Sequence, residues 1–394
     1  MQDQSASPTD GLPLSGVRVV ALEQAVAGPL CSRHLADLGA DVVKIEQPPR
    51  DGSAGGDLAR HYDAVVQGLA AHWVWLNRGK RSVALNVKDP EDRRVLEALL
   101  DRADVFVHNL GPGAVDRLGY GWDALHARWP KVVSCAISGY GMGGPYQERK
   151  AYDLLLQGES GVIAVTGTPE FPAKVGISIG DIGAAMYAVS SILAALFERN
   201  RTGEGRMIDI SMLDCLTEWI MPPVYYEMYG GLETPRAGMR HAMMVPQGPY
   251  RTGDGGSVSI GVQNDPQWRR LCIKVLGHPE WIDDPRFRTN PLRKENREIL
   301  EPMIEEALSI YTRASAMEAL DKADIPFGSL NEVADVLNHP QHAARDRWFE
   351  VESEVGKVRA FAPPFNILGM PRRADAIPAL GEHTDEVKRE LGLA

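Results

Sequence analysis

The stretch that decides the fold is Val17-Arg-Val-Val-Ala-Leu22, followed by Gly28-Pro29 and Asp41-Val-Val-Lys-Ile-Glu46. The two β-branched runs predict strands. Between them, Gly28-Pro29 opens a predicted helix with leucines at positions 30, 35 and 38, and Gly39 follows where a helix-ending glycine belongs. A strand, a helix of about three turns and a second strand predict a βαβ unit with parallel strands.

The same alternation continues along the chain. Residues 61–69 predict a short helix, and Asp89-Pro90 supplies a cap and a first-position proline for a helix that runs to about Arg102. Because strands alternate with helices, we expect an α/β fold with a doubly wound, mostly parallel sheet. The further strands are expected at 82–86, 105–108, 132–137 and 207–211.

The composition changes near residue 212. Residues 212–245 hold six of the thirteen methionines and a cluster of aromatic residues, and 250–262 predicts a hairpin that turns at Gly253-Asp-Gly-Gly256. We therefore expect a large Rossmann-like domain and a smaller α+β domain. The expected ranges are a loose tail over 1–13, the large domain over 14–219, the small domain over 220–331 and a C-terminal segment over 332–394 that returns to the large domain.

The totals exclude several classes of partner. A net charge of −11 argues against nucleic acid as a general partner. The four cysteines are scattered without a metal or disulfide spacing, which is typical of reduced residues in a cytoplasmic protein. No uninterrupted apolar run is long enough to cross a bilayer, and residues 1–10 lack the basic and apolar regions of a signal peptide.

One acidic residue stands out, in Ile177-Ser-Ile-Gly-Asp181, just before the apolar helix expected over 184–198. We expect Asp181 at a strand-to-helix corner, where the helix N-terminus keeps a carboxylate ionised at neutral pH. Such a carboxylate can act as a nucleophile, and the alternative is an ordinary helix cap. Gly176-Ile-Ser178-Ile-Gly180 also matches the hydrolase elbow, but that elbow starts its helix directly after the serine, which favours Asp181.

Other motifs are weaker. Gly139-Tyr-Gly-Met-Gly-Gly144 matches a dinucleotide pattern, but a proline and a polar stretch follow it where a helix is required. His339-Pro-Gln-His342 has no further ligand nearby and predicts no metal. The turn Asn109-Leu-Gly-Pro-Gly113, with Arg117 after it, is either a phosphate-binding loop or a plain connector. Lys88 and the run Arg78-Gly-Lys-Arg81 are either part of a polyphosphate site or solvated charges.

The order of these motifs resembles the class III CoA-transferases, the superfamily that includes formyl-CoA transferase, carnitine CoA-transferase and α-methylacyl-CoA racemase. The similarity runs from residue 14 to the end of the chain. It rests on Ala27-Gly-Pro29, the run 38–46, Asn77-Arg-Gly-Lys-Arg-Ser82, Asn109-Leu-Gly-Pro-Gly113, Gly180-Asp181, Arg201-Thr-Gly-Glu-Gly205 and Leu380-Gly-Glu-His-Thr384. The resemblance implies that Asp181 forms an acyl anhydride and then a CoA thioester, and that two chains interlock as a homodimer.

The resemblance also implies where coenzyme A binds. Acyl-CoA and a small carboxylic acid would be the partners and substrates, with no permanently bound cofactor and no metal. The implied CoA contacts are Gln24, Ala25, Val26, Ala27, Leu85, Lys88, Asn109, Leu110, Gly111, Arg117, Arg149 and Lys150.

Two departures from the family bear on the substrate. Val26 stands where the formyl-CoA transferases have glutamine, and their glycine tetrad is missing, which disfavours formate. Ala151-Tyr152-Asp153 replaces the Gly-His-Asp run of the racemases, and tyrosine is a poor proton shuttle at neutral pH. This favours CoA transfer over a 2-methylacyl-CoA racemase, while a non-catalytic CoA-binding protein is the second alternative.

The acceptor is expected to be a short dicarboxylic acid such as succinate. Pro235-Arg236-Ala-Gly-Met-Arg240-His241 could bind a second carboxylate through Arg240 and His241. The same run could instead be a solvated linker, and the nearby methionines could line a pocket for an apolar acyl group. Tyr152 and Asp153 complete the expected substrate contacts.

Overall fold

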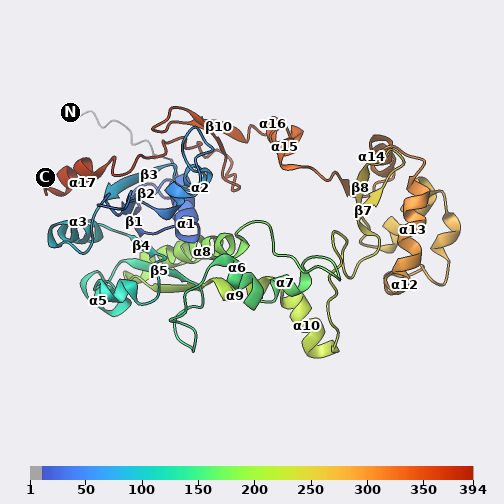
Figure 1. Cartoon of the computed structure of the whole chain (residues 1–394), viewed down its shortest axis with the longest axis horizontal. Helices are drawn as coiled ribbons and strands as arrows, with labels where there is room; N and C mark the ends of the chain where they lie inside the picture. The colour runs from blue at the N-terminus through green and yellow to red at the C-terminus, as the bar shows by residue number, and fades with distance from the viewer. Residues whose placement is uncertain (1–10, 394) are drawn as a thin grey trace. The chain divides into compact units, whose positions relative to one another are not determined.

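The computed structural model describes residues 11–393, which divide into two compact units (Figure 1). The first unit holds the described residues up to 162, then 175–221, and those from 342 onward. The second unit holds residues 163–174 and 222–341. The range expected for the small domain, 220–331, thus overlaps the second unit, which also takes in an earlier segment and continues to residue 341.

The first unit is built on a parallel six-stranded sheet, with the strand order β3-β2-β1-β4-β5-β6 (Figure 1). Every neighbouring pair is parallel, as the alternation of strands and helices predicted. The order reverses between β1 and β4, where open α/β sheets bind ligands at the carboxyl ends of the strands. The strands are β1 (Arg18–Leu22), β2 (Asp41–Glu46), β3 (Lys80–Ala84), β4 (Val105–His108), β5 (Val133–Ser138) and β6 (Met207–Ser211).

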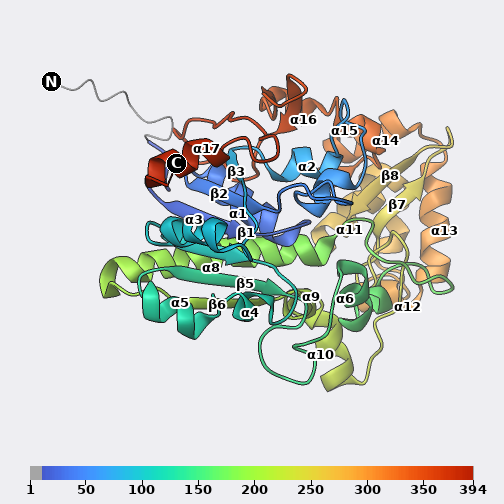
Figure 2. The same ribbon diagram turned by 60° about the vertical axis from the view of Figure 1, so that its left-hand side comes forward.

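Helices cover both faces of this sheet (Figure 2). Along β1, Val19 belongs to one hydrophobic cluster and Val20 to another, because successive side chains of a strand point to opposite faces. The first cluster packs α1 (Ala27–Asp37) and α8 (Ile179–Thr202) on the sheet, and the second packs α3 (Pro90–Leu100), α5 (Trp122–Arg128) and α17 (Thr384–Leu391). The doubly wound arrangement of the large unit is therefore present.

Some local predictions are wrong. The expected helix over 61–69 is replaced by a short 3-10 helix, η1 (Leu58–His61), and by α2 (Ala71–Leu76), because Gln67 and Gly68 both adopt positive φ in a tight turn. The strand expected at 82–86 is β3, Lys80–Ala84. The helix predicted from Asp89-Pro90 is present as α3, and the Asp89 side chain accepts a capping bond from the Glu91 N–H at 2.9 Å.

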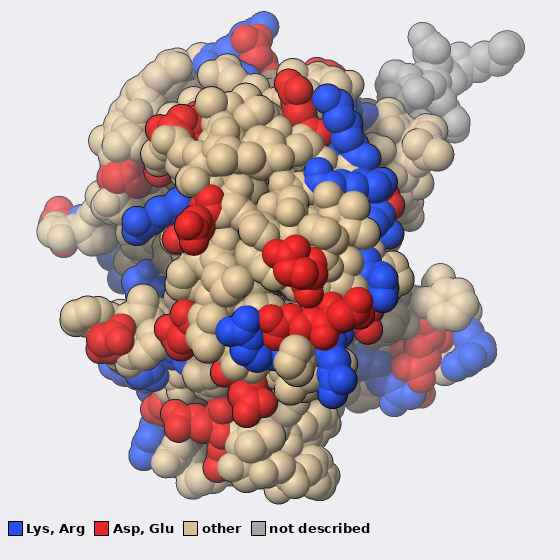
Figure 3. All heavy atoms as spheres, turned by 90° about the vertical axis from the view of Figure 1, so that its right-hand side faces the viewer, with Lys and Arg blue, Asp and Glu red and all other residues tan. Residues whose placement is uncertain are grey.

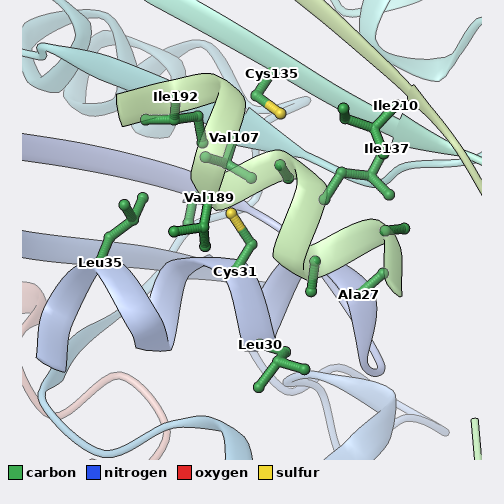
Figure 4. Packing of buried hydrophobic residues seen from close by; sticks show 14 of the residues in the cluster. Ala27, Leu30, Cys31, Leu35, Val107, Cys135, Ile137, Val189, Ile192 and Ile210 are labelled. Atoms are coloured by element: carbon green, nitrogen blue, oxygen red, sulfur yellow. The ribbon is translucent and has the colours of Figure 1, made fainter. Parts of the chain in front are cut away.

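Helix α8 packs only one of its faces into the core. Figure 4 shows Val189 of α8 beside Cys31 and Leu35 of α1. The opposite face is exposed, and Phe197 on it is 78% accessible. Among residues 11–393, α8 is the one helix that is long and apolar enough to cross a membrane. Its buried half packs on the sheet, as the core helix of a globular protein does.

The second unit has its own core around a three-stranded antiparallel sheet. The predicted hairpin is present as β7 (Gln247–Arg251) and β8 (Ser257–Gly261), and β9 (Phe327–Gly328) adds the third strand. The face in Figure 3 shows basic and acidic side chains interspersed. The helices within this unit are α11 (Asp265–Leu271), η2 (Cys272–Leu276), η3 (Pro279–Ile282), α12 (Asn290–Glu295), α13 (Arg297–Leu308), α14 (Arg313–Lys322) and α15 (Val333–Val336).

The first unit is completed by shorter pieces. A hairpin of β10 (Trp348–Val351) and β11 (Val358–Phe361) packs with Trp73 of α2 in a small separate cluster. The other helices of this unit are α4 (Ala114–Arg117), α6 (Asp153–Glu159) and α9 (Met212–Trp219), while α7 (Val162–Val165), α10 (Met221–Gly230) and α16 (Pro340–Ala344) stand where the chain passes between units.

Candidate active site

Asp181 lies in the first turn of α8 and is not the cap of that helix. The helix begins at Ile179, and Ser178 is the N-cap residue, without a capping hydrogen bond from its side chain. No strand precedes it, so the expected strand-to-helix corner is wrong. The helix also starts directly after Ser178, which removes the reason given above for preferring Asp181 to the serine. The contacts of Asp181 decide between them.

Asp153 provides the missing cap. Its Oδ1 accepts the Gly180 N–H at 2.7 Å, so a carboxylate from the start of α6 satisfies an amide at the N-terminus of α8. Its Oδ2 accepts a hydrogen bond from Gln157 Nε2 at 2.6 Å, which fixes the orientation of the carboxylate. A Cβ at position 180 would lie 3.0 Å from Asp153 Oδ1, so glycine allows this close approach. The sequence therefore brings two carboxylates to one helix end.

The loop after β1 supplies a donor to the Asp181 carboxylate. The N–H of Ala27, at the start of α1, donates a hydrogen bond to it. This is possible because α1 and α8 pack against each other along the core face of the sheet (Figure 4). Gly28 keeps the loop close to its neighbours, since an added Cβ would lie 2.8 Å from Glu23 Cβ and 2.9 Å from Asn109 Oδ1.

The environment of Asp181 favours its protonated form. Burial raises the pKa of Asp181 to about 7, the negative charge of Asp153 adds to the rise, and the Ala27 N–H opposes it. The expectation that the helix N-terminus keeps this carboxylate ionised at neutral pH is therefore wrong. The helix N-terminus does not overcome desolvation, because the amide of Gly180 donates to Asp153 instead. A carboxyl group with a pKa near 7 is only half ionised at neutral pH and is a more basic nucleophile than an ordinary aspartate.

Asn109, which directly follows β4, binds the loop between β1 and α1 (residues 23–26). Its Oδ1 accepts the Gln24 N–H, and its Nδ2 donates to the Gln24 carbonyl, both at 2.8 Å. The side chain thus pairs with the backbone as a neighbouring strand would. The predicted loop residues Gln24 and Asn109 are brought together, although they are 85 positions apart in the chain.

A cavity of about 500 Å³ opens beside this loop, at the carboxyl edge of the sheet. Four of the residues expected to contact coenzyme A line it, namely Gln24, Lys88, Leu110 and Arg117. Arg93 also lines it and was missed, because a single cation inside the α3 pattern carries no motif. The lining also includes the carboxylates of Glu23, Glu46 and Asp57, but these are paired with Lys44, Lys80 and Arg60. The remaining lysine and two arginines of the lining suit an anionic ligand.

The other expected CoA contacts lie elsewhere in the first unit. The side chains of Val26, Ala27 and Leu85 are buried in the hydrophobic core, which leaves their backbone groups for any contact with a ligand. The Arg149 guanidinium stacks 3.4 Å from the centre of the Tyr146 ring, and Lys150 beside it is exposed. Neither of these two cations lines the cavity, and Ala25 and Gly111 do not line it either.

Two tyrosines accompany Asp181. Tyr152, 75% exposed, is the N-cap residue of α6 and immediately precedes Asp153. Tyr62 was missed by the sequence analysis, since it lies in the segment whose structure was predicted wrongly. Burial raises the pKa of the Tyr62 phenol, and the nearby Asp57, Asp181 and Tyr152 raise it further.

Arg240 and His241 lie in the second unit. The Arg240 guanidinium pairs with Glu301 at 2.5 Å and with Glu305 at 2.6 Å, and it stacks on the Tyr250 ring. His241 Nδ1 accepts the backbone N–H groups of residues 243 and 244. Both side chains are therefore engaged inside their own unit, which the sequence pattern did not indicate.

The run 139–144 is a glycine loop after β5 without a following helix, as predicted. All four cysteines are free and buried. Among residues 11–393, no group of three or more histidine, cysteine, aspartate or glutamate side chains is placed to hold a metal ion.

Comparison with known proteins places the chain in a family. The model of CoA-transferase family III matches residues 14–384, and the chain belongs to that family. It is 32% identical to the succinyl-CoA:glutarate CoA-transferase of Mus musculus, covering 96% of this chain and 86% of that protein. It is 33% identical to the succinate–glutarate CoA-transferase of Agrobacterium fabrum, with 96% of each chain covered.

A solved structure agrees with the fold. A CAIB/BAIF family protein from Brucella suis superposes with a TM-score of 0.83 at 33% identity, covering 96% of this chain and 99% of that one. The mixed α/β architecture and the six-stranded parallel sheet are therefore those of the family.

Proposed function

We propose that this CoA-transferase moves CoA from an acyl-CoA donor to a short dicarboxylic acid, with Asp181 as the covalent nucleophile. The observation that carries the proposal is the Asp181 carboxyl group, which is partly buried, receives the Ala27 N–H and stands opposite Asp153. A carboxylate so desolvated is a stronger nucleophile than one in water. The substrate class is supported by the two relatives named for succinate or succinyl-CoA and glutarate.

The proposed first step is attack on the thioester. An Asp181 oxygen attacks the acyl carbonyl, the carbon–sulfur bond breaks, and CoA leaves as a thiolate while a mixed anhydride forms. The thiolate then attacks the aspartyl carbonyl, which releases the donor acid and leaves an aspartyl-CoA thioester. The Ala27 N–H, which faces Asp181, is proposed to stabilise the negative charge that develops on the Asp181 carboxyl oxygen.

The acceptor then reverses these steps. Its carboxylate attacks the aspartyl thioester and displaces the thiolate, giving a second mixed anhydride. Attack of the thiolate on the acceptor's acyl carbonyl forms the new acyl-CoA and regenerates the Asp181 carboxylate. Lys88, Arg93 and Arg117 around the cavity are proposed to hold the CoA phosphates.

A transfer assay tests the proposal. Wild-type protein, Asp181→Ala and Asp181→Asn are incubated with succinyl-CoA and a panel of mono- and dicarboxylic acids, and new CoA esters are identified by mass spectrometry. We expect transfer to dicarboxylic acids by the wild type and a loss of several orders of magnitude in both variants. Retention of substantial activity by Asp181→Asn would exclude the covalent mechanism.

The recognition of the second carboxylate is proposed to involve Arg240 and His241, although two glutamates already neutralise Arg240. A succinate carboxylate would have to compete with Glu301 and Glu305. Comparing succinate with butyrate in wild type and in Arg240→Ala decides this point. An unchanged succinate preference in a folded variant removes Arg240 from the site.

A racemase is the second candidate, because a carboxyl group with a pKa near 7 also suits proton transfer. Tyr152 at the position of the racemase histidine disfavours it. Exchange of the α-proton of a 2-methylacyl-CoA in deuterated water, lost in Asp181→Asn, would establish this activity.

The assembly is proposed to be an interlocked homodimer in the cytoplasm. The outer face of α8 exposes Met186, Tyr187 and Phe197, and Trp219 of α9 is exposed beside Tyr187, with its Nε1 3.2 Å from the Tyr187 hydroxyl. Exposed large apolar side chains on neighbouring helices suit burial against a second copy. Four buried free cysteines suit a reducing compartment. Sedimentation at high dilution tests the dimer, and a folded monomer would refute it.

A further inference from the structure

The loop between β1 and α1 (residues 23–26) contains a strained residue, two positions before the Ala27 N–H that faces Asp181. Ala25 has a φ of 62°, in the left-handed region that non-glycine residues avoid. Such a conformation persists only where the surroundings impose it. Two residues later the chain delivers the Ala27 N–H to Asp181. A group that holds Ala25 in this conformation therefore also determines the direction of the Ala27 N–H.

Asn109 pairs with the backbone of Gln24, and the Asp57 carboxylate is the side chain that accepts the N–H of Ala25 itself. Its Oδ1 accepts the Ala25 N–H at 2.8 Å and the Ala59 N–H at 2.9 Å. Its Oδ2 accepts Lys44 Nζ at 2.7 Å, and the side chain of this lysine is completely buried. Asp57 thus bridges a fixed cation and the strained loop.

Asp57 is held in place by Glu46, the last residue of β2. Glu46 Oε2 accepts the Asp57 N–H at 2.9 Å and also the Arg60 Nε at 2.8 Å. Glu46 Oε1 accepts the Ser82 hydroxyl at 2.6 Å, and Ser82 Oγ accepts the Gly381 N–H at 2.9 Å. A continuous chain of hydrogen bonds therefore runs from the sheet to the loop that faces the nucleophile.

We infer that Asp57 is a positioning residue for the reaction, because it holds Ala25 in the left-handed conformation that keeps the Ala27 N–H on the Asp181 carboxylate. The inference rests on the proposed role of Asp181. Asp57 also lines the cavity, but both of its oxygens are engaged by the protein. Its part is to orient the loop, not to bind the ligand.

The direction of the expected effect separates positioning from simple electrostatics. The groups that face Asp181 are Asp153 from α6, the Ala27 N–H from α1 and the Tyr62 phenol. Loss of the Ala27 hydrogen bond destabilises the carboxylate and raises the pKa of Asp181. Removal of a negative charge at position 57, or entry of water, would lower it instead.

Asp57→Asn is the informative variant. The asparagine has one acceptor oxygen where the carboxylate has two, so it cannot serve Lys44 and the Ala25 N–H together. The Lys44 ammonium group forms the stronger hydrogen bond and takes the asparagine oxygen. The side-chain NH2 group, which cannot accept a hydrogen bond, then faces the N–H groups of Ala25 and Ala59. Asp104→Asn is the matched control, since Asp104 also bridges a backbone N–H, that of Arg18 at 2.8 Å, and a cation, Arg199 at 2.9 Å.

The readout is the titration of Asp181 itself, followed by nuclear magnetic resonance of aspartate labelled at the carboxyl carbon in the full-length protein. The signal is assigned by its loss in Asp181→Asn. We expect Asp57→Asn to raise the midpoint by about one pH unit, the size of one charge-assisted hydrogen bond. Asp104→Asn should leave the midpoint unchanged. An unchanged or lowered midpoint in Asp57→Asn overturns the inference.

Two further measurements keep the outcome decisive. If Asp57→Asn does not fold, Ala25→Val replaces it, since a β-branched residue disfavours positive φ, and it must raise the same midpoint. In the transfer assay, Asp57→Asn should lower kcat/KM at pH 7 by about fivefold, and by less at pH 9, because fewer Asp181 groups are ionised. Absence of transfer in the wild type would refute the proposed function, whereas the titration would still decide the role of Asp57.

Discussion

Replacing Asp181 with asparagine should make the protein more stable at alkaline pH while abolishing its activity. In the wild type, the folded state binds the Asp181 proton with a pKa of about 7, against an ordinary value of 3.8. Protonation of Asp181 therefore stabilises the folded protein fully below pH 3.8. This stabilisation is lost as the pH rises from 3.8 through about 7. Asparagine keeps an acceptor for the Ala27 N–H and does not titrate.

The size of the effect follows from the shift. At about 1.4 kcal/mol per pKa unit, Asp181→Asn should gain about 2 kcal/mol relative to wild type at pH 5 and about 4 kcal/mol at pH 8. These are upper figures, because the carboxyl group is partly exposed and solvent screens its charge.

Urea unfolding followed by circular dichroism, at one protein concentration, measures the difference at both pH values. Asp123→Asn is the matched control, since Asp123 is an exposed aspartate in the first turn of α5. Its effect should be small and the same at pH 5 and pH 8. A gain for Asp181→Asn that does not grow between pH 5 and pH 8 would refute the raised pKa of the desolvated Asp181 carboxyl group.

Three further changes probe the surroundings of the nucleophile. Asp153→Asn removes a like charge, so the acidic limb of kcat/KM should move down by about one pH unit, and a limb that stays in place contradicts the pairing. Lys88→Ala should raise KM for the acyl-CoA by about three- to tenfold with little change in kcat, most clearly at low salt; steady-state kinetics at two ionic strengths check this. Gly28→Ala, whose Cβ would meet Glu23 and Asn109, should lower the free energy of unfolding by about 1–3 kcal/mol, which thermal melts measure; a neutral result would show that the loop can yield.

The fold could be predicted where its signals are local. The β-branched runs 17–22 and 41–46, with Gly28-Pro29 and Gly39 between them, carry the βαβ unit because strand propensity, helix start and helix end are all written within a few residues. The region 58–76 was mispredicted because two positive-φ residues interrupt what looks like a helical pattern.

The site was predictable only in part. Asp181 could be singled out as a lone acidic residue before an apolar helix. Its ionisation state could not, because desolvation arises from the packing of α1 on α8 and from Asp153, which meets the N-terminus of α8 through a hydrogen bond to Gly180. Asp57 gave no signal at all, since its partner Lys44 is buried inside a strand whose pattern reads as apolar.

The central claim is that Asp181 is acylated during transfer, and an oxygen-labelling experiment tests it most directly. When a carboxylate acceptor attacks the aspartyl thioester and its acyl group then leaves to CoA, one acceptor oxygen remains on the aspartate. A single turnover with succinyl-CoA and heavy-oxygen-labelled glutarate is digested with trypsin, and the peptide that contains Asp181 is analysed by mass spectrometry. We predict one heavy oxygen on the Asp181 side chain. Formation of glutaryl-CoA with no label at Asp181 would contradict the account.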